Sequence, residues 1–224
     1  VGSGRGLPMQ IASVEKAMTY AAQKLGKVQD ESGVIGLVFG AQATNEALYA
    51  LAQVAEALAA AGSRVQRYLS GRAPRPERAD KILRSADVNP NTAGARVLAG
   101  DARSFEQLVA DLGSGRLKAL WMVGEDVPVK SGDEAGLCAL LDKLDLFIIQ
   151  AVHNTTIAQR AQVLLPAASW AEIDGTFTNH KGHVQRIRRA VAPPGDARGH
   201  LELISLLAAK LGLANGQPWQ AGPQ

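Results

Sequence analysis

The stretch that decides the fold is "GVIGLVFGAQATNEALYALAQVAEALAAAGSRVQRYL", residues 33–69. Its first eight residues, 33–40, form a continuous apolar run rich in branched side chains, as in a strand buried on both faces of a parallel sheet. After a polar turn, apolar residues recur at helical spacing until Gly62: Leu48, Leu51, Ala52, Ala55, Leu58 and Ala59. A second candidate strand follows at 64–69. Strand, helix and strand in this order predict a βαβ unit.

The same alternation continues along the chain. A helix is predicted from the N-cap Ser13 to a stop at Gly26, and a closing helix over 200–212. Capping boxes, Ser104 with Gln107 and Ser131 with Glu134, predict two more helices, and "TTIAQRAQ" predicts two further helical turns. The remaining predicted strands are 117–124, 144–150 and 163–166. This order predicts an α/β fold with a mostly parallel, Rossmann-like sheet and helices on both faces.

The predicted domain covers residues 13–212, between a linker at 1–12 and a tail at 213–224. Within it, residues 70–100 are rich in Pro, Arg, Asp and Asn, which predicts a long excursion that is either ordered or mobile.

Composition limits the possible functions. A single cysteine, Cys138, excludes a disulfide framework and a cysteine-rich metal site built from this chain alone. The net charge of +3 is a mild excess, and aromatic residues make up only 4%, so stacking platforms for nucleic acid are scarce. Neither a signal peptide nor an apolar run of about 18 residues is present, which predicts a soluble, cytoplasmic protein. The mild net charge and the few aromatic residues predict that it does not bind nucleic acid.

Four predicted strands end in polar turns: 40–45, 124–128, 150–156 and the stretch after Pro166. Carboxyl ends of parallel strands meet at one edge of a sheet, so these turns are expected to line one crevice. The alternative for each turn is that its polar residues only cap the next helix, Thr44 or Asn45 in one case and Asn154 or Thr155 in another.

Other residue patterns offer little support for catalysis or metal binding. Glu172 and Asp174 lack an accompanying nucleophile, so a structural salt bridge is the favoured interpretation of this pair. His180 and His183 flank a glycine and have no further ligands at recognised spacing, which favours a turn. We therefore predict no catalytic residue and no metal ligand in this chain. The last pattern is a short basic ribbon formed by Lys181, Arg186, Arg188 and Arg189. Its side chains could bind phosphates or an acidic partner, or they could be the solvated charges of an edge strand.

Several of these stretches together resemble a known family: "GAQATNEALY", "ADVNPNTAGA", "LKALWMVGEDVP" and "AQVLLPAASWAEIDGTFTNHKGHVQRIRRAVAPPGDAR", followed by the closing helix. Over roughly residues 10–212 they resemble the core domain of the molybdopterin oxidoreductase superfamily. The resemblance is strongest to the large subunit of bacterial NADH:quinone oxidoreductase, respiratory complex I. Catalytic members of the superfamily hold a pterin guanine dinucleotide that carries molybdenum or tungsten. The resemblance places eight residues at that site: Gly124, Glu125, Thr155, Thr156, Glu172, Gly175, Thr176 and Asn179.

The resemblance also implies a role. The family's cysteine-rich iron-sulfur region and its C-terminal barrel lie outside this sequence. We expect a non-catalytic scaffold domain of an electron-transfer protein like the large subunit of complex I, with a vestigial molybdopterin guanine dinucleotide crevice and no cofactor in this chain. Its expected partners are other subunits of a respiratory NADH dehydrogenase complex, including an iron-sulfur domain. Through that complex the chain would lie peripheral to the inner membrane.

Two other functions remain open from the sequence. The chain is alternatively the cofactor-binding portion of a molybdopterin-dependent, formate dehydrogenase-like oxidoreductase. A third possibility is an unrelated protein that binds a small nucleotide in a Rossmann-like crevice.

Overall fold

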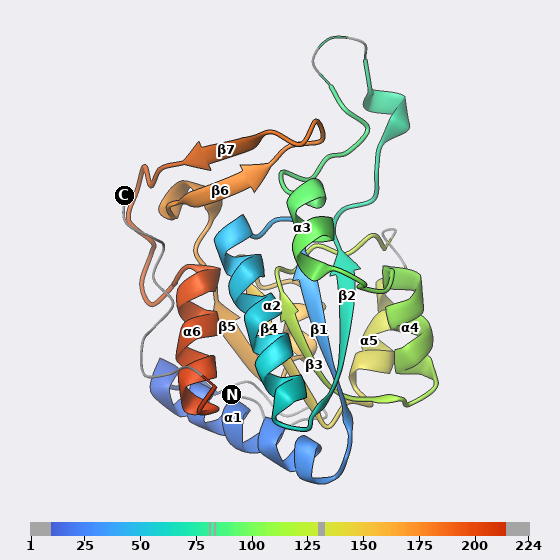
Figure 1. Ribbon diagram of the computed structural model, residues 1–224, viewed down its shortest axis with the longest axis vertical. Coiled ribbons are helices and arrows are strands. Elements are labelled where there is room, and N and C mark those ends of the chain that lie inside the picture. Colours follow the sequence, from blue (N-terminus) through green and yellow to red (C-terminus); the bar gives the residue numbers. More distant parts are fainter. Residues whose placement is uncertain (1–9, 81, 83, 130–132, 214–224) are drawn as a thin grey trace.

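Helices and strands alternate along the chain (Figure 1). The computed structural model describes residues 10–80, 82, 84–129 and 133–213. The elements in chain order are α1 (Val14–Asp30), β1 (Val34–Gly40), α2 (Asn45–Ala60), β2 (Arg64–Ser70), η1 (Pro76–Arg78), α3 (Thr92–Ala99), α4 (Phe105–Gly113), β3 (Leu117–Val123), α5 (Glu134–Leu141), β4 (Leu146–Ala151), η2 (Ala158–Arg160), β5 (Val163–Pro166), η3 (Trp170–Glu172), β6 (Gly175–Thr178), β7 (Val184–Ile187) and α6 (His200–Lys210).

The central sheet has five strands in the order β2-β1-β3-β4-β5, and each neighbouring pair is parallel. All seven residues of β1 and all six of β4 are buried, which is why these strands appear in the sequence as uninterrupted apolar runs. The predicted α/β class and the predicted parallel sheet are confirmed.

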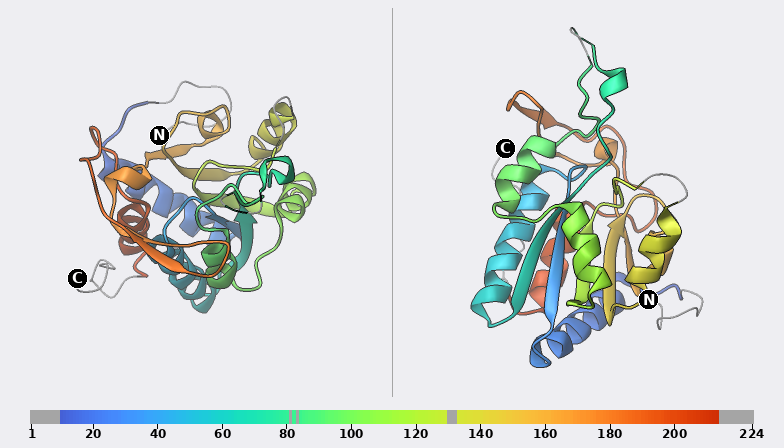
Figure 2. Two further views of the ribbon diagram at one scale, coloured as in Figure 1. Left: turned by 90° about the horizontal axis from the view of Figure 1, so that it is seen from above. Right: turned by 90° about the vertical axis from the view of Figure 1, so that its right-hand side faces the viewer.

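Helices cover both faces of this sheet. On one face α1, α2, α3 and α6 pack over a core that includes Leu37, Trp121 and Ile148. On the other face α4 and α5 pack over a second core that includes Leu120 and Phe147. These two residues come directly before Trp121 and Ile148 of the first core in the sequence. Successive side chains of a strand point to opposite faces, so two cores form around one sheet. The right-hand view of Figure 2 shows the green α4 and yellow α5 on the opposite side of the sheet from the cyan α2.

One predicted helix end and one predicted pair of helical turns are wrong. Helix α1 continues through Gly26 to Asp30, because Leu25 and Val28 are both buried and extend its apolar face past the glycine. A chain reversal with a positive φ of 56° at Ser32 follows instead. The stretch predicted to give two helical turns after β4 forms only the short 3-10 helix η2.

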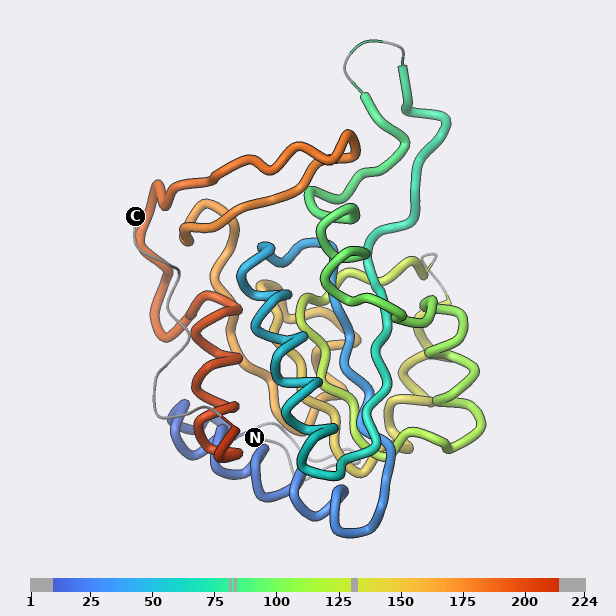
Figure 3. The backbone as a smooth tube through the Cα atoms, viewed as in Figure 1, coloured from blue at the N-terminus to red at the C-terminus, as the bar shows by residue number. Residues whose placement is uncertain are grey.

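The predicted excursion over 70–100 contains helix α3, which the sequence patterns did not indicate. The preceding residues form an arm that projects beyond the body of the protein at the carboxyl end of the sheet (Figure 3). Backbone hydrogen bonds cross the arm, from Arg75 N–H to the Ala86 carbonyl at 2.8 Å and from Asp80 N–H to the Arg84 carbonyl at 3.0 Å. The described residues of the two sides of the arm are therefore joined by backbone hydrogen bonds.

The capping box at Ser104 and Gln107 is confirmed. Ser131, the predicted cap of the next helix, lies outside the described residues, and the N-cap of α5 is Asp133. Strands β6 and β7 form a separate antiparallel ribbon that lies across the N-terminal end of α2 (Figure 1). Among the described residues, none of the helices has the length and apolar character needed to cross a membrane.

Candidate functional site

The site lies where the strand order of the sheet reverses. From β1 the chain passes through α2 to β2 on one side, whereas β3, β4 and β5 lie on the other side of β1. All five strands are parallel, so their carboxyl ends share one edge. Ligands of open α/β sheets bind at this edge, at the position where the strand order reverses. The geometry therefore selects the turns after β1 and β3.

Two glycines bring these turns together. A Cβ atom at Gly40 would lie 2.1 Å from the carbonyl oxygen of Val123, so the ends of β1 and β3 approach too closely for any other residue there. Gly124, the next residue of the second turn, has a φ of +91°, which L side chains rarely adopt. Its N–H donates to the carbonyl of Gln150 at 3.0 Å, which fixes the start of this turn against β4.

A cavity of about 760 Å³ lies beside these turns and is lined by Gln42 of the first and Gly124 of the second. This volume is within the range of sites that bind nucleotides and cofactors. The turns after β1, β3, β4 and β5, the base of the arm, the β6–β7 ribbon and the start of α6 all contribute to its wall. The lining residues are Gln42, Arg72, Asp87, Val88, Asn89, Pro90, Gly124, Glu125, Asp126, Val152, His153, Ala168, Ser169, Trp170, Ile173, Phe177, Ile187 and His200.

Glu125 joins two turns of the cavity wall. One of its carboxylate oxygens accepts a hydrogen bond from the backbone N–H of Val152 at 3.0 Å, and the other lies 2.7 Å from Nδ1 of His153. The Glu125 side chain is only 10% exposed, whereas His153 is largely exposed at the cavity mouth. The carboxylate therefore fixes the turn after β4 onto the turn after β3.

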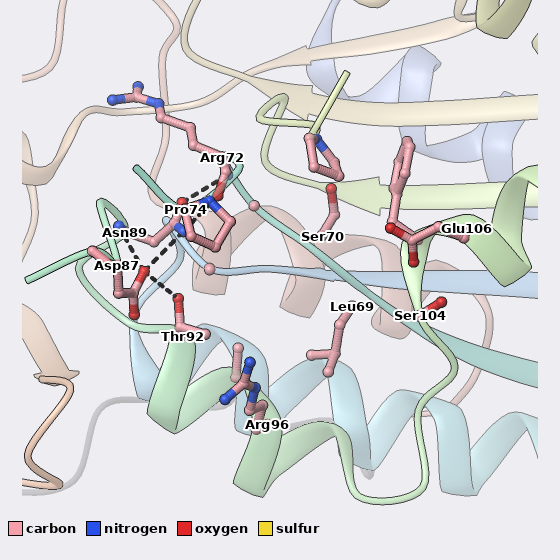
Figure 4. Close-up of a pocket in the computed structure, with 16 residues that line it drawn as sticks. Leu69, Ser70, Arg72, Pro74, Asp87, Asn89, Thr92, Arg96, Ser104 and Glu106 are labelled. Carbon is pink, nitrogen blue, oxygen red and sulfur yellow. Dashed lines mark hydrogen bonds between the residues drawn. The ribbon is translucent and has the colours of Figure 1, made fainter. Parts of the chain in front are cut away.

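The base of the arm supplies the opposite wall. Arg72 pairs with Asp126 at 3.0 Å, and the Asn89 side chain binds both the N–H and the carbonyl of Arg72 at 2.8 and 3.0 Å. Asp87 accepts from Asn89 and from the Thr92 hydroxyl, each through the same oxygen. A second cavity of about 470 Å³ shares Arg72, Asp87 and Asn89 with the first (Figure 4). The arm base therefore stands between two adjoining cavities.

His200 is a buried ionisable group in the cavity wall. Its Nδ1 lies 2.9 Å from Oε1 of Gln150, a side chain with no exposed surface at the end of β4. Burial lowers the pKa of His200 to about 4, and the nearby Glu125 carboxylate opposes this only in part. The imidazole is therefore neutral at pH 7. The amide nitrogen of Gln150 is buried without a hydrogen-bond partner within the described residues.

Two of the eight residues predicted at a cofactor site, Gly124 and Glu125, line the cavity. Thr155 and Thr156 follow β4 but are not part of the lining. The Thr155 hydroxyl accepts from the N–H of Ala158 at 3.1 Å at the start of η2, and Thr156 is exposed. The capping alternative therefore describes Thr155. It also describes Thr44, whose hydroxyl accepts from the N–H of Ala47 at the start of α2.

The other four predicted residues hold the surrounding structure together. Glu172 forms a capping box with Ser169. Asn179 closes the turn between β6 and β7 by accepting from the N–H groups at 181 and 183, at 2.9 and 3.1 Å. Gly175 packs so tightly that a Cβ there would lie 2.7 Å from the methyl carbon of Thr44. These contacts account for the polar residues and the glycine of this loop without a ligand.

Thr176 ties the ribbon to helix α2. Its N–H and hydroxyl donate to the two carboxylate oxygens of Glu46 at 2.9 and 2.7 Å, and Asn45 donates to the Thr176 hydroxyl at 3.1 Å. On the same strand, Thr178 receives a hydrogen bond from Asn45, and its N–H donates to the side chain of Asn91 at 2.8 Å. The ribbon therefore covers the start of α2 beside the cavity.

The salt bridge expected at Glu172 and Asp174 is wrong. Glu172 is used in its capping box, and Asp174 accepts from the N–H of Arg189 at 3.4 Å; neither forms an ion pair in the part of the chain that the structure describes. His180 and His183 lie in and beside the exposed β6–β7 turn. Across residues 10–80, 82, 84–129 and 133–213, no group of three or more potential metal ligands comes together.

Sequence reasoning missed Arg72, Asp87 and His200. Arg72 follows the polar end of β2, so the rule that selected the other strand ends would have selected it too. Asp87 comes from the arm, whose fold back onto the sheet has no sequence signal. His200 reaches the cavity because residue 198 pairs with residue 167 beside β5 and places the start of α6 at the same edge.

Comparison with known proteins identifies the family. The molybdopterin oxidoreductase family matches residues 61–210, which is more than half of the chain. The F420-dependent formate dehydrogenase 2 subunit alpha of Methanococcus maripaludis is 46% identical over 97 residues, which cover 43% of this chain and 14% of that protein. The F420-dependent formate dehydrogenase subunit alpha of Methanocaldococcus jannaschii is 38% identical over 126 residues, 56% of this chain and 17% of that protein. A nitrate reductase of Klebsiella oxytoca is 32% identical over 115 residues, 51% of this chain and 13% of that protein.

The chain therefore spans less than a fifth of the length of these relatives. They are formate dehydrogenase and nitrate reductase subunits, so the resemblance to the superfamily is confirmed, whereas the finer resemblance to complex I finds no support in them. The match covers β2, β3, β4, β5, the ribbon and α6, which form most of the cavity wall. The chain belongs to the molybdopterin oxidoreductase family.

Proposed function

We propose that this chain is the nucleotide-binding portion of a molybdopterin-dependent oxidoreductase of the formate dehydrogenase kind. The observation that carries the proposal is the cavity lined by Gly124, at the reversal of strand order, in a chain whose relatives include formate dehydrogenase alpha subunits. The ligand is the guanine dinucleotide of a molybdopterin. Its metal and pterin supply two-electron redox chemistry, and this chain supplies the grip on the nucleotide.

One structural feature fits such a ligand. Gly124, which lines the cavity, has no side chain, so a diphosphate can come close to the main chain at this turn. The residues that would hold the ligand are Gln42, Arg72 and the Gly124–Glu125 turn.

Each of the three acidic side chains that line the cavity already has partners within the protein. Asp126 is paired with Arg72, and Glu125 accepts two hydrogen bonds from the turn after β4. Asp87 is held by Asn89 and Thr92. Since each carboxylate already has partners, Glu125 and Asp87 shape the wall, and Arg72 is the guanidinium group of the described cavity lining.

The test is titration calorimetry of the whole 224-residue chain with GDP-mannose, whose internal diphosphate matches that of a pterin guanine dinucleotide. We expect saturable binding at one site. Arg72→Gln should weaken binding at least tenfold, as expected for loss of one charge-assisted hydrogen bond. Arg75→Gln, a matched change on the arm outside the cavity lining, should leave it unaltered. Absence of binding, or equal losses in both variants, would contradict the proposal.

The second candidate is a scaffold domain of a protein like the large subunit of complex I, with a vestigial crevice. It is favoured by the internal use of Glu172, Thr176 and Asn179, which leaves these polar residues bonded to protein. It predicts no molybdenum, tungsten or guanine nucleotide in protein purified from a host that makes the cofactor. It also predicts co-purification with an iron-sulfur domain of a respiratory NADH dehydrogenase. Stoichiometric metal and nucleotide release would favour the first candidate instead.

A further inference from the structure

The charges around the cavity leave an anionic ligand poorly balanced. Among the described lining residues, three carboxylates, at Asp87, Glu125 and Asp126, stand against the single guanidinium of Arg72, which is already paired. The two remaining ionisable groups of the lining are His153 and His200. A dinucleotide with two phosphate charges therefore enters a region whose nearest fixed charges are mostly negative.

His200 is placed to correct this balance. The residue is buried, and its Nδ1 is engaged by Gln150, so Nε2 is the ring nitrogen left for a ligand. Glu125 is the charged group that acts on His200, and the other ionisable side chains of the described cavity lining are Arg72, Asp87, Asp126 and His153. On the α6 side, Glu202 is paired with Arg198. An imidazolium at this position would lie in the same cavity wall as Glu125, where an incoming phosphate binds under this proposal.

We propose that His200 is an anion-binding residue of the crevice that takes up a proton when the internal diphosphate of a nucleotide binds. The inference rests on the proposed function, because it concerns the same cavity. It assigns to His200 a contact with the phosphates and a change of charge on binding, which neither the sequence patterns nor the family resemblance assigned.

The physical basis is the opposition between burial and charge. In the free protein, desolvation lowers the pKa of His200 to about 4, so the ring is neutral near pH 7. Phosphate charges within the same poorly solvated cavity stabilise the imidazolium and raise that pKa toward neutrality. Because the bound form then carries one more proton than the free form, binding must tighten as the pH falls.

GDP-mannose is the suitable probe, because its diphosphate has no ionisation between pH 5 and pH 7. Calorimetry of the whole chain in two buffers of different ionisation enthalpy gives the number of protons absorbed per ligand. We expect this number to approach one near pH 5.5. The dissociation constant should be about 50-fold smaller at pH 5 than at pH 7 if the pKa of His200 rises from about 4 to about 7.

Two variants identify the group. His200→Asn keeps an N–H in the position of Nδ1 for Gln150 but cannot titrate, and it should abolish proton uptake and flatten the pH dependence. His183→Asn, the matched change at an exposed histidine outside the cavity lining, should retain both. Proton uptake that persists in His200→Asn, or disappears in His183→Asn, overturns the inference.

NMR provides a readout that does not depend on the folding of a variant. The chain has four histidines, and ring nitrogen shifts distinguish imidazole from imidazolium. At pH 6 the His200 ring should be neutral in the free protein and protonated with GDP-mannose bound. Binding without protonation refutes this inference while leaving the proposed function intact. Absence of binding at every pH refutes both.

Discussion

Replacing Gly40 with alanine tests the geometry on which the candidate site depends. The added methyl carbon would lie 2.1 Å from the carbonyl oxygen of Val123 and 3.2 Å from its carbonyl carbon. The neighbour is backbone of the adjacent strand, so no side-chain rotation relieves the overlap. The carboxyl ends of β1 and β3 must move apart by about 1 Å to restore an ordinary carbon-oxygen contact.

The expected loss of stability follows from that displacement. Overpacking a rigid region typically destabilises a protein by about 1–3 kcal/mol, and we expect about 3 kcal/mol here because the obstacle is main chain. For a chain of this length that corresponds to a fall in melting temperature of about 6–12 °C. Separation of the strands also displaces Gly124 and Glu125, so GDP-mannose binding should weaken at least tenfold at a temperature where the variant is folded.

The assay is thermal unfolding followed by circular dichroism, with titration calorimetry on the folded variant. Gly26→Ala is the matched control, since a Cβ at Gly26 has no neighbour within 4 Å and the residue lies inside α1. It should stabilise the protein by about 0.5–1 kcal/mol through helix propensity. A melting temperature of Gly40→Ala within about 2 °C of the original chain would refute the close approach of β1 and β3.

Three further changes test other parts of the structure. Burial lowers the pKa of His200 to about 4, so below neutrality the unfolded chain, with an ordinary histidine, binds more protons than the folded one. The free energy of unfolding should therefore fall by about 2 kcal/mol through this residue between pH 7.5 and pH 5, and denaturant titrations of His200→Asn should lack that component. Asp111→Ala should destabilise the protein by about 3 kcal/mol, because the buried Tyr68 hydroxyl, which lies 2.6 Å from the Asp111 carboxylate, loses its hydrogen-bond partner. Tyr68→Phe should destabilise it by only about 1 kcal/mol. Equal losses of stability for the two variants in urea titrations would contradict this. Glu46→Gln weakens the two hydrogen bonds from Thr176, so trypsin should cut the β6–β7 ribbon faster, and an unchanged cleavage rate would show that the ribbon is held elsewhere.

The strands of the sheet were predictable because burial on both faces leaves a direct trace in the sequence. The apolar runs at 33–40 and 117–124 match β1 and β3 to within one residue at each end. Helix ends were less predictable where packing outweighs local preference. Gly26 looked like a stop, but the buried Val28 extends α1 by another turn.

The site was predictable only in part. The edge of the sheet follows from strand direction, and Gly124 and Glu125 follow from the end of a strand. By contrast, Thr176 and Asn179 have the residue types of a ligand-binding loop but form hydrogen bonds to Glu46 and within their own turn. Residue type shows that a side chain can form hydrogen bonds, and the tertiary fold decides with which partner.

The sequence by itself determined the α/β class, the parallel direction of the strands and the edge at which we propose that a ligand binds, because these follow from local periodicity and from chain connectivity. Only the tertiary structure decided that Arg72 and His200, 128 positions apart, lie on the wall of one cavity. It also decided that the ribbon is tied to α2 by Thr176. The physical reason is that these contacts join segments whose separation along the chain is far longer than any local pattern.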